Sequence, residues 1–234
     1  MSNFRFKQFE ITQNDNAMKV GTDAMVLGSF INSHGRKKGL DVGSGTGVLS
    51  LMIAQNNLDI SIDAVELDAL SAAEGELNFK NSPWPERLKT HHCDFLEYET
   101  EEKYDLIVSN PPYYQTTLVN QDDRKANARH EKSLPMREFI LKARRLLSDD
   151  GEFWFIVPVE DEQVWKKQCN SANLHMIEKI SIHGKVGGDT KRVIFVCCNY
   201  KSILEESHFS VRDKSNGYSK EYKELTREFH FNVL

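Results

Sequence analysis

Short apolar runs alternate with helical stretches between residues 38 and 157, and this alternation constrains the fold more than any other feature of the chain. The strand-like runs are residues 38–43, 61–68 (which alternates apolar and polar residues), 88–93, 104–109 and 153–157. Helical patterns at 48–55, 69–80 and 136–147 lie between them. Because neighbouring parallel strands need a long crossover, usually a helix, this order predicts a parallel sheet with helices on its faces.

The last third of the chain predicts an edge hairpin and a helical tail. Strand-like runs at 176–182 and 192–199 follow a helical stretch at 161–171, and a glycine-bearing segment at 184–188 joins them. Residues 218–229 carry an apolar stripe at helical spacing. We therefore expect an α/β fold with a mostly parallel seven-stranded sheet, an antiparallel edge hairpin and helices on both faces. No repeat or linker divides the chain, so a single domain over residues 1–234 is expected.

Composition narrows the function classes. A net charge of -5 argues against nucleic-acid binding by the whole surface, because such binding depends on neutralising phosphates. Three basic groups could still form a local face: residues 36–38, residues 124–132 (with Arg124, Lys125 and Arg129) and residues 142–145. No apolar run approaches the roughly 18 residues of a membrane span, so a cytoplasmic protein is expected. The four cysteines show neither metal nor disulfide spacing and are expected to be buried or idle thiols.

A glycine turn, Asp41-Val42-Gly43-Ser44-Gly45-Thr46-Gly47, follows the first predicted strand and opens a helix. Glycines allow a ligand to approach the backbone closely, so Gly43, Ser44 and Gly45 are candidate binding residues. The dinucleotide fingerprint requires glycine at its sixth place, where this chain has Val48. Hydride chemistry with NAD is therefore disfavoured.

The acid Asp41 indicates the charge of the ligand. A carboxylate would repel a bound diphosphate, but it suits a cation. S-adenosylmethionine carries a sulfonium and an ammonium, and a carboxylate here could hold its amino-acid end directly or through water. The alternative is that Asp41 only forms the turn.

Two further acids end the next strands. Glu66 closes the second strand, where an open sheet places an acid against ribose hydroxyls. Asp94 follows the third strand and could accept from an adenine amino group. Either acid could instead be a helix N-cap, as Asp68 is expected to be.

The tetrapeptide Asn110-Pro111-Pro112-Tyr113 directly follows the fourth strand. Hydrogen-bond acceptors on both N–H groups of a conjugated amine draw its delocalised lone pair toward tetrahedral geometry. The Asn110 side-chain oxygen and the Pro111 carbonyl could be these acceptors, held in place by the two prolines. Tyr113 could stack on an extruded base. The alternative is a rigid exit from the strand.

Other chemistries lack their signatures. His91, His92 and Cys93 are neighbours on a strand and point to alternate faces, so no metal site is assigned. There is no G-x-S-x-G elbow and no phosphate loop ending in Gly-Lys-Ser/Thr.

With these motifs the chain resembles the class I S-adenosylmethionine-dependent methyltransferases, which have a Rossmann-like fold, and among them the amino-methyltransferases marked by Asn-Pro-Pro-Tyr. Blocks along the whole chain resemble bacterial tRNA (adenine-N6)-methyltransferases: residues 4–9, 17–24, 82–84 and 110–114, and the tail residues Tyr218, Ser219, Tyr222, Leu225, Thr226 and Phe229. The resemblance implies N6-methylation of the adenine next to the anticodon, adenine 37 of tRNA1(Val), with S-adenosylmethionine as cofactor and tRNA as partner.

The resemblance also implies a pocket for the cofactor. An N-terminal segment, 1–36, is expected to cover it, with a core at 37–200 and a helical tail at 201–234. The expected cofactor-binding residues are Lys19, Thr22, Asp23, Asp41, Gly43, Ser44, Gly45, Glu66, Leu67, Asp94, Phe95 and Asn110. A monomer is favoured. RNA contacts by Arg124, Lys125 and Arg129 are a hypothesis, since residues 115–132 match the family poorly.

Two alternatives remain. Asn-Pro-Pro-Tyr also resembles enzymes that methylate a glutamine side chain in translation release factors, but those carry a separate N-terminal helical domain, and only some 35 residues precede the first strand here. The other alternative is a non-catalytic module that binds the cofactor or RNA, which an intact Asn110–Tyr113 motif disfavours.

Overall fold

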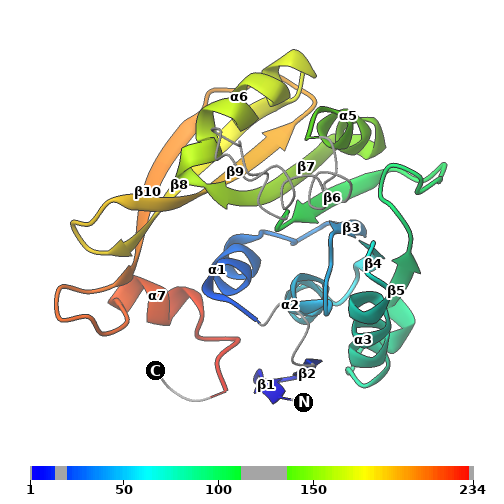
Figure 1. Ribbon diagram of the computed structural model, residues 1–234, viewed down its shortest axis with the longest axis horizontal. Coiled ribbons are helices and arrows are strands. Elements are labelled where there is room, and N and C mark those ends of the chain that lie inside the picture. Colours follow the sequence, from blue (N-terminus) through cyan, green and yellow to red (C-terminus); the bar gives the residue numbers. More distant parts are fainter. Residues whose placement is uncertain (1, 14–19, 112–135, 232–234) are drawn as a thin grey trace, which may run out of the picture.

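A computed structural model describes residues 2–13, 20–111 and 136–231 (Figure 1). Five parallel strands form the middle and one side of its main sheet: β3 (Lys38–Val42), β4 (Ser61–Glu66), β5 (Leu88–His92), β6 (Tyr104–Ser109) and β7 (Leu147–Pro158). The strand order is β10-β8-β9-β7-β6-β3-β4-β5. The parallel sheet predicted from the alternating runs is therefore confirmed.

The other side of the sheet differs from the expectation in one strand. β8 (His175–Lys185) and β9 (Thr190–Cys198) form the predicted antiparallel hairpin. An eighth strand, β10 (Glu205–Arg212), pairs in parallel with β8 and takes the edge position. The expected count of seven strands and the expected helical tail from 201 were wrong here. β10 is apolar only at Phe209 and Val211, because only one of its faces is buried, and so its sequence pattern is weak.

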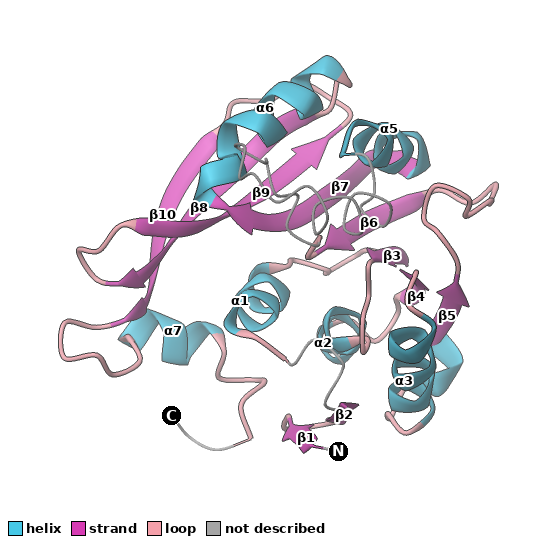
Figure 2. Cartoon of the chain, in the orientation of Figure 1, coloured by secondary structure: helices cyan, strands magenta, loops and turns pink. Residues whose placement is uncertain are grey.

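Helices cover both faces of the sheet (Figures 1 and 2). On one face lie α1 (Thr22–Phe30), α2 (Val48–Asn56), α3 (Ala69–Lys80) and α7 (Lys220–Leu225). On the other lie α5 (Met136–Leu146) and α6 (Glu162–Ser171). Two separate apolar clusters follow this division, since one includes Leu51 and Tyr222 and the other Phe139 and Trp165. Short 3-10 turns, η1 (Pro85–Arg87) and η2 (Val159–Asp161), precede β5 and α6.

Polar caps set the start of two helices. Asp68 accepts a hydrogen bond from the backbone N–H of Ser71 at 2.9 Å, so its expected N-cap role is confirmed. Ser219 caps α7 in the same way, accepting from the N–H of Tyr222 at 2.9 Å. The tail helix is shorter than the predicted 218–229, but Tyr222 and Phe229 are buried as its apolar stripe required.

The two ends of the described chain meet beneath α2 and α3. A small hairpin of β1 (Ser2–Arg5) and β2 (Glu10–Gln13) packs there, and the Lys7 N–H donates to the Phe229 carbonyl at 3.0 Å. The Asn78 side chain on α3 accepts from the Thr12 N–H at 2.9 Å and donates to the Thr12 carbonyl at 3.1 Å. Within the described ranges, no helix is long and apolar enough to cross a membrane.

Candidate functional site

The candidate residues converge at the carboxyl ends of four neighbouring strands. β5, β4, β3 and β6 are adjacent and parallel, so the segments that follow them share one edge of the sheet. After β3 the chain turns to α2 on one face, whereas after β6 it continues to α5 on the other. Such a reversal between adjacent strands is where open α/β sheets form a ligand crevice.

The glycine turn has the backbone that only glycine adopts readily. Gly43, Gly45 and Gly47 have φ angles of 70°, 54° and 82°. A Cβ at Gly43 or Gly45 would meet nothing within 4 Å, so the space beside these two residues is open. A Cβ at Gly47 would lie 2.4 Å from the Phe79 ring. The first two glycines therefore leave room for a ligand, and the third allows α3 to pack closely.

Asp41 lies fully buried at the base of this turn. Its Oδ2 accepts from the Ser50 N–H at 3.2 Å and from the Ser50 hydroxyl at 2.7 Å. Its Oδ1 is buried without a hydrogen-bond partner among the described residues. Burial raises the pKa of the Asp41 carboxyl to about 7, opposed by the Ser50 hydrogen bonds and reinforced by the charge of Glu66. An unpaired buried acceptor of this kind is satisfied by a cationic donor.

Glu66 is held by the backbone on both of its oxygens. Oε2 accepts from the Gly45 N–H and Oε1 from the Asp68 N–H, each at 2.8 Å. The side chain is only partly buried, and each carboxylate oxygen can accept a further hydrogen bond. Glu66 is thus fixed beside the glycine turn with capacity for two ligand hydroxyls.

Three further candidate residues, Leu67, Asp94 and Phe95, differ in how far their side chains are exposed. Leu67, directly after Glu66, is 47% exposed, so its side chain is accessible to a flat apolar ligand. Asp94 is partly buried, and its Oδ1 accepts from the Leu96 N–H at 2.8 Å. The Phe95 ring is buried and packs edge-on against Phe139 at 5.4 Å. A ligand contact by Phe95 would therefore involve its backbone.

Asn110 stands beyond the carboxyl end of β6, next to the end of β3. Ser109 pairs with Val42 in the ladder, and its hydroxyl donates to the Val42 carbonyl at 2.8 Å. Asn110 is partly buried, and its side chain makes no hydrogen bond to another described residue, whereas Pro111 is buried. Pro112 and Tyr113 lie outside the described residues. The structure thus places the Asn110 amide, which has no hydrogen-bond partner among the described residues, on a fixed strand end beside the glycine turn.

The N-terminal candidates lie at the start of α1. Thr22 is exposed, and Asp23 forms an ion pair with Arg192 of β9 at 2.8 Å. Lys19 lies outside the described residues. The Val20 N–H donates to the side-chain oxygen of Gln13 at 2.9 Å, so the chain returns to β2 before α1 begins. The role of segment 1–36 as a cover over the pocket remains a prediction.

Three supporting residues were missed by reasoning from the sequence. Ser50 holds Asp41, Ser109 links the ends of β6 and β3, and Asn78 donates to the Thr46 carbonyl at 2.9 Å. Through Asn78 the N-terminal hairpin is connected to the glycine turn. None of the three belongs to a motif used in the sequence analysis, and the partners of Ser109 and Asn78 are distant along the chain.

Histidine and cysteine side chains have structural environments. His91 lies 2.7 Å from an oxygen of Asp63, whose other oxygen accepts from the Tyr104 hydroxyl at 3.0 Å. All four cysteines are free, and Cys169, Cys197 and Cys198 are buried. Across the described ranges, no three His, Cys, Asp or Glu side chains gather in a way that could hold a metal ion.

The basic groups proposed as a local face are mostly engaged elsewhere. Arg36, Lys37 and Lys38 form ion pairs with Glu152, Asp59 and Glu102, at the amino ends of the strands. Lys142 is only 7% exposed and donates to the Leu96 carbonyl at 2.7 Å, and Arg144 donates to the Asn173 carbonyl. Residues 124–132 lie outside the described residues.

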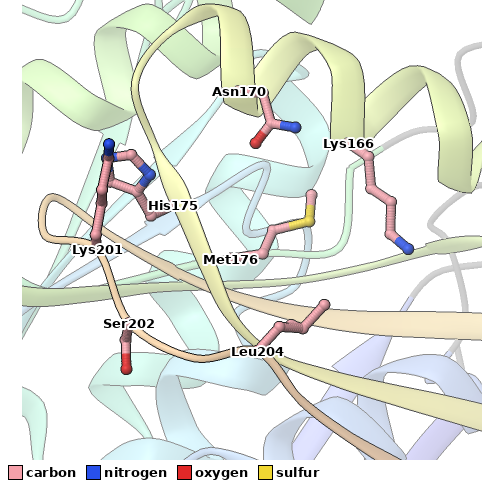
Figure 3. A pocket seen from close by; sticks show the side chains of 7 residues that line it. All are labelled: Lys166, Asn170, His175, Met176, Lys201, Ser202 and Leu204. Carbon is pink, nitrogen blue, oxygen red and sulfur yellow. The ribbon is translucent and has the colours of Figure 1, made fainter.

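A separate shallow hollow of about 390 Å³ lies between α6, the start of β8 and the segment before β10 (Figure 3). Its polar lining includes Lys166, Asn170, His175 and Lys201. His175 pairs with Cys198, at the end of the sheet opposite to Asn110. This hollow therefore takes no part in the candidate site.

Comparison with known proteins gives a family match and full-length relatives. The family model for the methyltransferase small domain matches residues 15–163. A protein of Aliivibrio fischeri is 36% identical over 230 residues, covering 98% of both chains, and is named tRNA1(Val) (adenine(37)-N6)-methyltransferase. A Bacteroides thetaiotaomicron protein of the same name is 36% identical over 233 residues, again covering 98% of both chains.

Solved structures share the fold at low sequence identity. A predicted O-methyltransferase from Agrobacterium tumefaciens superposes with a TM-score of 0.70 at 16% identity, covering 88% of this chain and 96% of the other. An S-adenosylmethionine-dependent methyltransferase from Clostridium acetobutylicum gives 0.51 at 13% identity, covering 69% and 83%. At these identities the likeness extends to the fold alone.

Proposed function

The chain belongs to the methyltransferase small domain family, together with the relatives named above, and we propose that it methylates N6 of adenine 37 in tRNA1(Val) with S-adenosylmethionine as methyl donor. The family resemblance inferred from the glycine turn and the Asn-Pro-Pro-Tyr motif is thereby confirmed. The anticodon region as the binding site, a monomeric state, a single domain and a cytoplasmic location are part of the same proposal.

The residues at the carboxyl edge fit this cofactor. S-adenosylmethionine supplies a methyl group activated by a positively charged sulfur. Asp41 offers to its ammonium group, directly or through water, a buried oxygen that has no hydrogen-bond partner among the described residues. Glu66 offers two fixed oxygens to the ribose hydroxyls, and Leu67 offers an exposed apolar surface to the adenine. Asp94 accepts a hydrogen bond from the amino group of the cofactor's adenine.

The geometry of Asn110 and Pro111 supports methyl transfer to a conjugated amine. The lone pair of an adenine N6 is delocalised into the ring, so this nitrogen is a weak nucleophile. The Asn110 side-chain oxygen and the Pro111 carbonyl accept hydrogen bonds from its two N–H groups and favour the tetrahedral form. Their positions are fixed before the substrate binds, because Ser109 ties the strand end to β3. One N6 proton is released to solvent after the transfer.

One observation carries the proposal: a side-chain amide without a described hydrogen-bond partner follows β6, directly beside a glycine turn whose acids suit a cation. The acceptor amine and the methyl donor would thus meet at the β3–β6 crevice. A binding module without activity would not need this amide.

The test is transfer of labelled methyl from S-adenosylmethionine to bulk tRNA from a strain that lacks this protein, followed by nucleoside analysis. We expect label in N6-methyladenosine, located at position 37 of tRNA1(Val) by mapping of nuclease fragments. A translation release factor serves as the competing substrate in a parallel reaction. Label in a glutamine of that protein, with none in tRNA, would contradict the proposal.

A further inference from the structure

The carboxyl edge of the sheet continues beyond β6 to the tip of the β8–β9 hairpin. β7 runs parallel to β6, and its Pro158 is paired with Arg192 near the start of β9. His183 near the end of β8 is paired with Thr190, so the hairpin tip, residues 184–189, lies at the same edge as Asn110. Three strand spacings separate β6 from β8, which is about 14 Å.

Four cations gather at this end of the sheet: Lys185, Lys191, Arg212 and Lys214, here named the basic edge. Arg212 is the ladder partner of Lys185, so their side chains share one face of the sheet. The three lysines are exposed, and no described residue lies within ion-pair distance of them. Their charges are therefore available to a partner.

The fourth cation is held in position. The Arg212 guanidinium donates to the Asn216 carbonyl at 2.8 Å and lies 5.0 Å from the centre of the Tyr218 ring. These contacts orient the guanidinium without neutralising it, because neither partner is charged. The basic edge thus combines one fixed cation with three exposed lysines.

Two acids, Asp189 and Asp213, lie in the same segments as the four cations, so positive charge remains in excess although these carboxylates offset part of it. The Asp213 carboxylate accepts from the N–H groups of Ser215 and Gly217 at 2.8 and 3.1 Å, so it stabilises its own turn. Asp189 is exposed in the hairpin turn. A histidine pair, His183 and His208, lies on the same face with ring nitrogens 3.0 Å apart. Positive charge predominates here although the whole chain carries -5.

We propose that the basic edge binds the phosphate backbone of the RNA whose adenine is presented to Asn110. This inference rests on the proposed function and adds to it the surface that holds the substrate. Exposed, unpaired lysines gain the most from phosphate contact, because neutralising phosphates releases condensed counterions. The ion-paired residues Arg36, Lys37 and Lys38 would first have to give up protein partners, and they lie at the opposite end of the strands.

The hollow in Figure 3 is the competing surface. Of its two lysines, Lys166 already pairs with Glu162 at 2.8 Å. Lys201 lies beyond β9, at the amino end of the neighbouring parallel strands. RNA bound in the hollow would have to extend along the full length of the strands to reach Asn110, so the hollow is the weaker candidate.

The test compares two triple variants of the full chain. The first replaces Lys185, Lys191 and Lys214 with alanine, and the matched control replaces the exposed lysines Lys89, Lys167 and Lys201. Binding of tRNA is measured against salt concentration, and kcat and KM for tRNA are measured at one salt. Because the first variant can no longer neutralise three phosphates, the slope of log affinity against log salt should fall by about 2 to 3. We expect KM to rise at least tenfold, kcat to stay within twofold, and the control to match the unaltered protein.

Two further measurements separate the outcomes. Affinity for S-adenosylmethionine, measured by calorimetry, should be unchanged in the first variant, which shows that it is folded. Arginine in place of the same three lysines should restore tRNA binding, and failure of that restoration would refute an electrostatic role. If the unaltered protein methylates no tRNA, the proposed function fails. If it does, and both triple variants share its salt slope and KM, only the basic edge is refuted.

Discussion

Replacing Asp41 with asparagine distinguishes two effects of this carboxylate: the stability lost by burying its charge, and its proposed contribution to cofactor binding. Asp41 is fully buried, and its pKa is raised from 3.8 to about 7, mainly by burial. A pKa difference of one between folded and unfolded chains corresponds to about 1.4 kcal/mol, so the ionised carboxylate costs the folded protein about 4 kcal/mol. Asparagine has nearly the same shape, and its oxygen can still accept from Ser50.

The sign of the pH effect follows from linkage. Well below pH 4 the carboxyl is protonated in both folded and unfolded chains, so it contributes no pH dependence. As the pH rises toward 7 the unfolded chain ionises first, and the free energy of unfolding falls. The asparagine variant lacks this loss. The variant's free energy of unfolding minus that of the unaltered protein should therefore be about 3 kcal/mol larger at pH 8 than at pH 5.

The asparagine variant should gain stability at pH 8 but lose affinity for the cofactor. Loss of a charge-assisted hydrogen bond costs about 1.5–3 kcal/mol, so the Kd for S-adenosylmethionine at pH 8 should rise roughly ten- to hundredfold. Urea denaturation without cofactor at pH 5 and pH 8, together with calorimetry at pH 8, measures both effects. If the difference in free energy of unfolding between the variant and the unaltered protein does not vary with pH, the raised pKa of buried Asp41 is refuted. If the Kd for S-adenosylmethionine is unchanged, the ligand contact is refuted.

Three further predictions concern neighbouring residues. Asn110→Ala should lower kcat about 100-fold or more while leaving the Kd for S-adenosylmethionine within a fewfold, and single-turnover kinetics with full activity would rule out its assigned role. Glu66→Gln removes an acceptor from the Gly45 or Asp68 N–H and should weaken cofactor binding about tenfold by calorimetry. Gly47→Ala combines a φ of 82° with a Cβ 2.4 Å from Phe79, and should cost about 2–4 kcal/mol in urea denaturation. Gly35→Ala, with a φ of 77° and open space, should cost only about 1–2 kcal/mol, and equal losses would contradict the packing argument.

The sequence predicts the site best where local chemistry decides the structure. The run at 104–109 is mostly apolar because both faces of the central strand β6 are covered, and a glycine turn must follow β3 because positive φ angles are required there. Asn110 could be located because it directly follows such a run. These features depend on a few consecutive residues.

Features that depend on distant contacts could not be predicted in this way. The strand β10 exists because β8 offers it an unpaired edge and α7 covers Phe209 and Val211, and eight residues with two apolar positions do not reveal this. Asn78 appears as an ordinary helix residue until Thr12 and Thr46 are placed beside it. The exposed lysines of the basic edge are likewise ordinary surface residues until the strand register brings them together.

The boundary between β3 and β6 separates the residues proposed to bind the cofactor from those proposed to bind the substrate. Asp41 in β3, Glu66 at the end of β4 and Asp94 after β5 lie on one side of it, and Asn110 with the basic edge lies on the other. Changes in β7, β8, β9 or β10 should therefore alter the affinity for the proposed RNA substrate while the proposed cofactor site stays intact. The hydroxyl of Ser109, bonded to the Val42 carbonyl, links the two halves at the carboxyl edge of the sheet, as Asp105 does at the amino end by accepting from the Lys37 and Lys38 N–H groups.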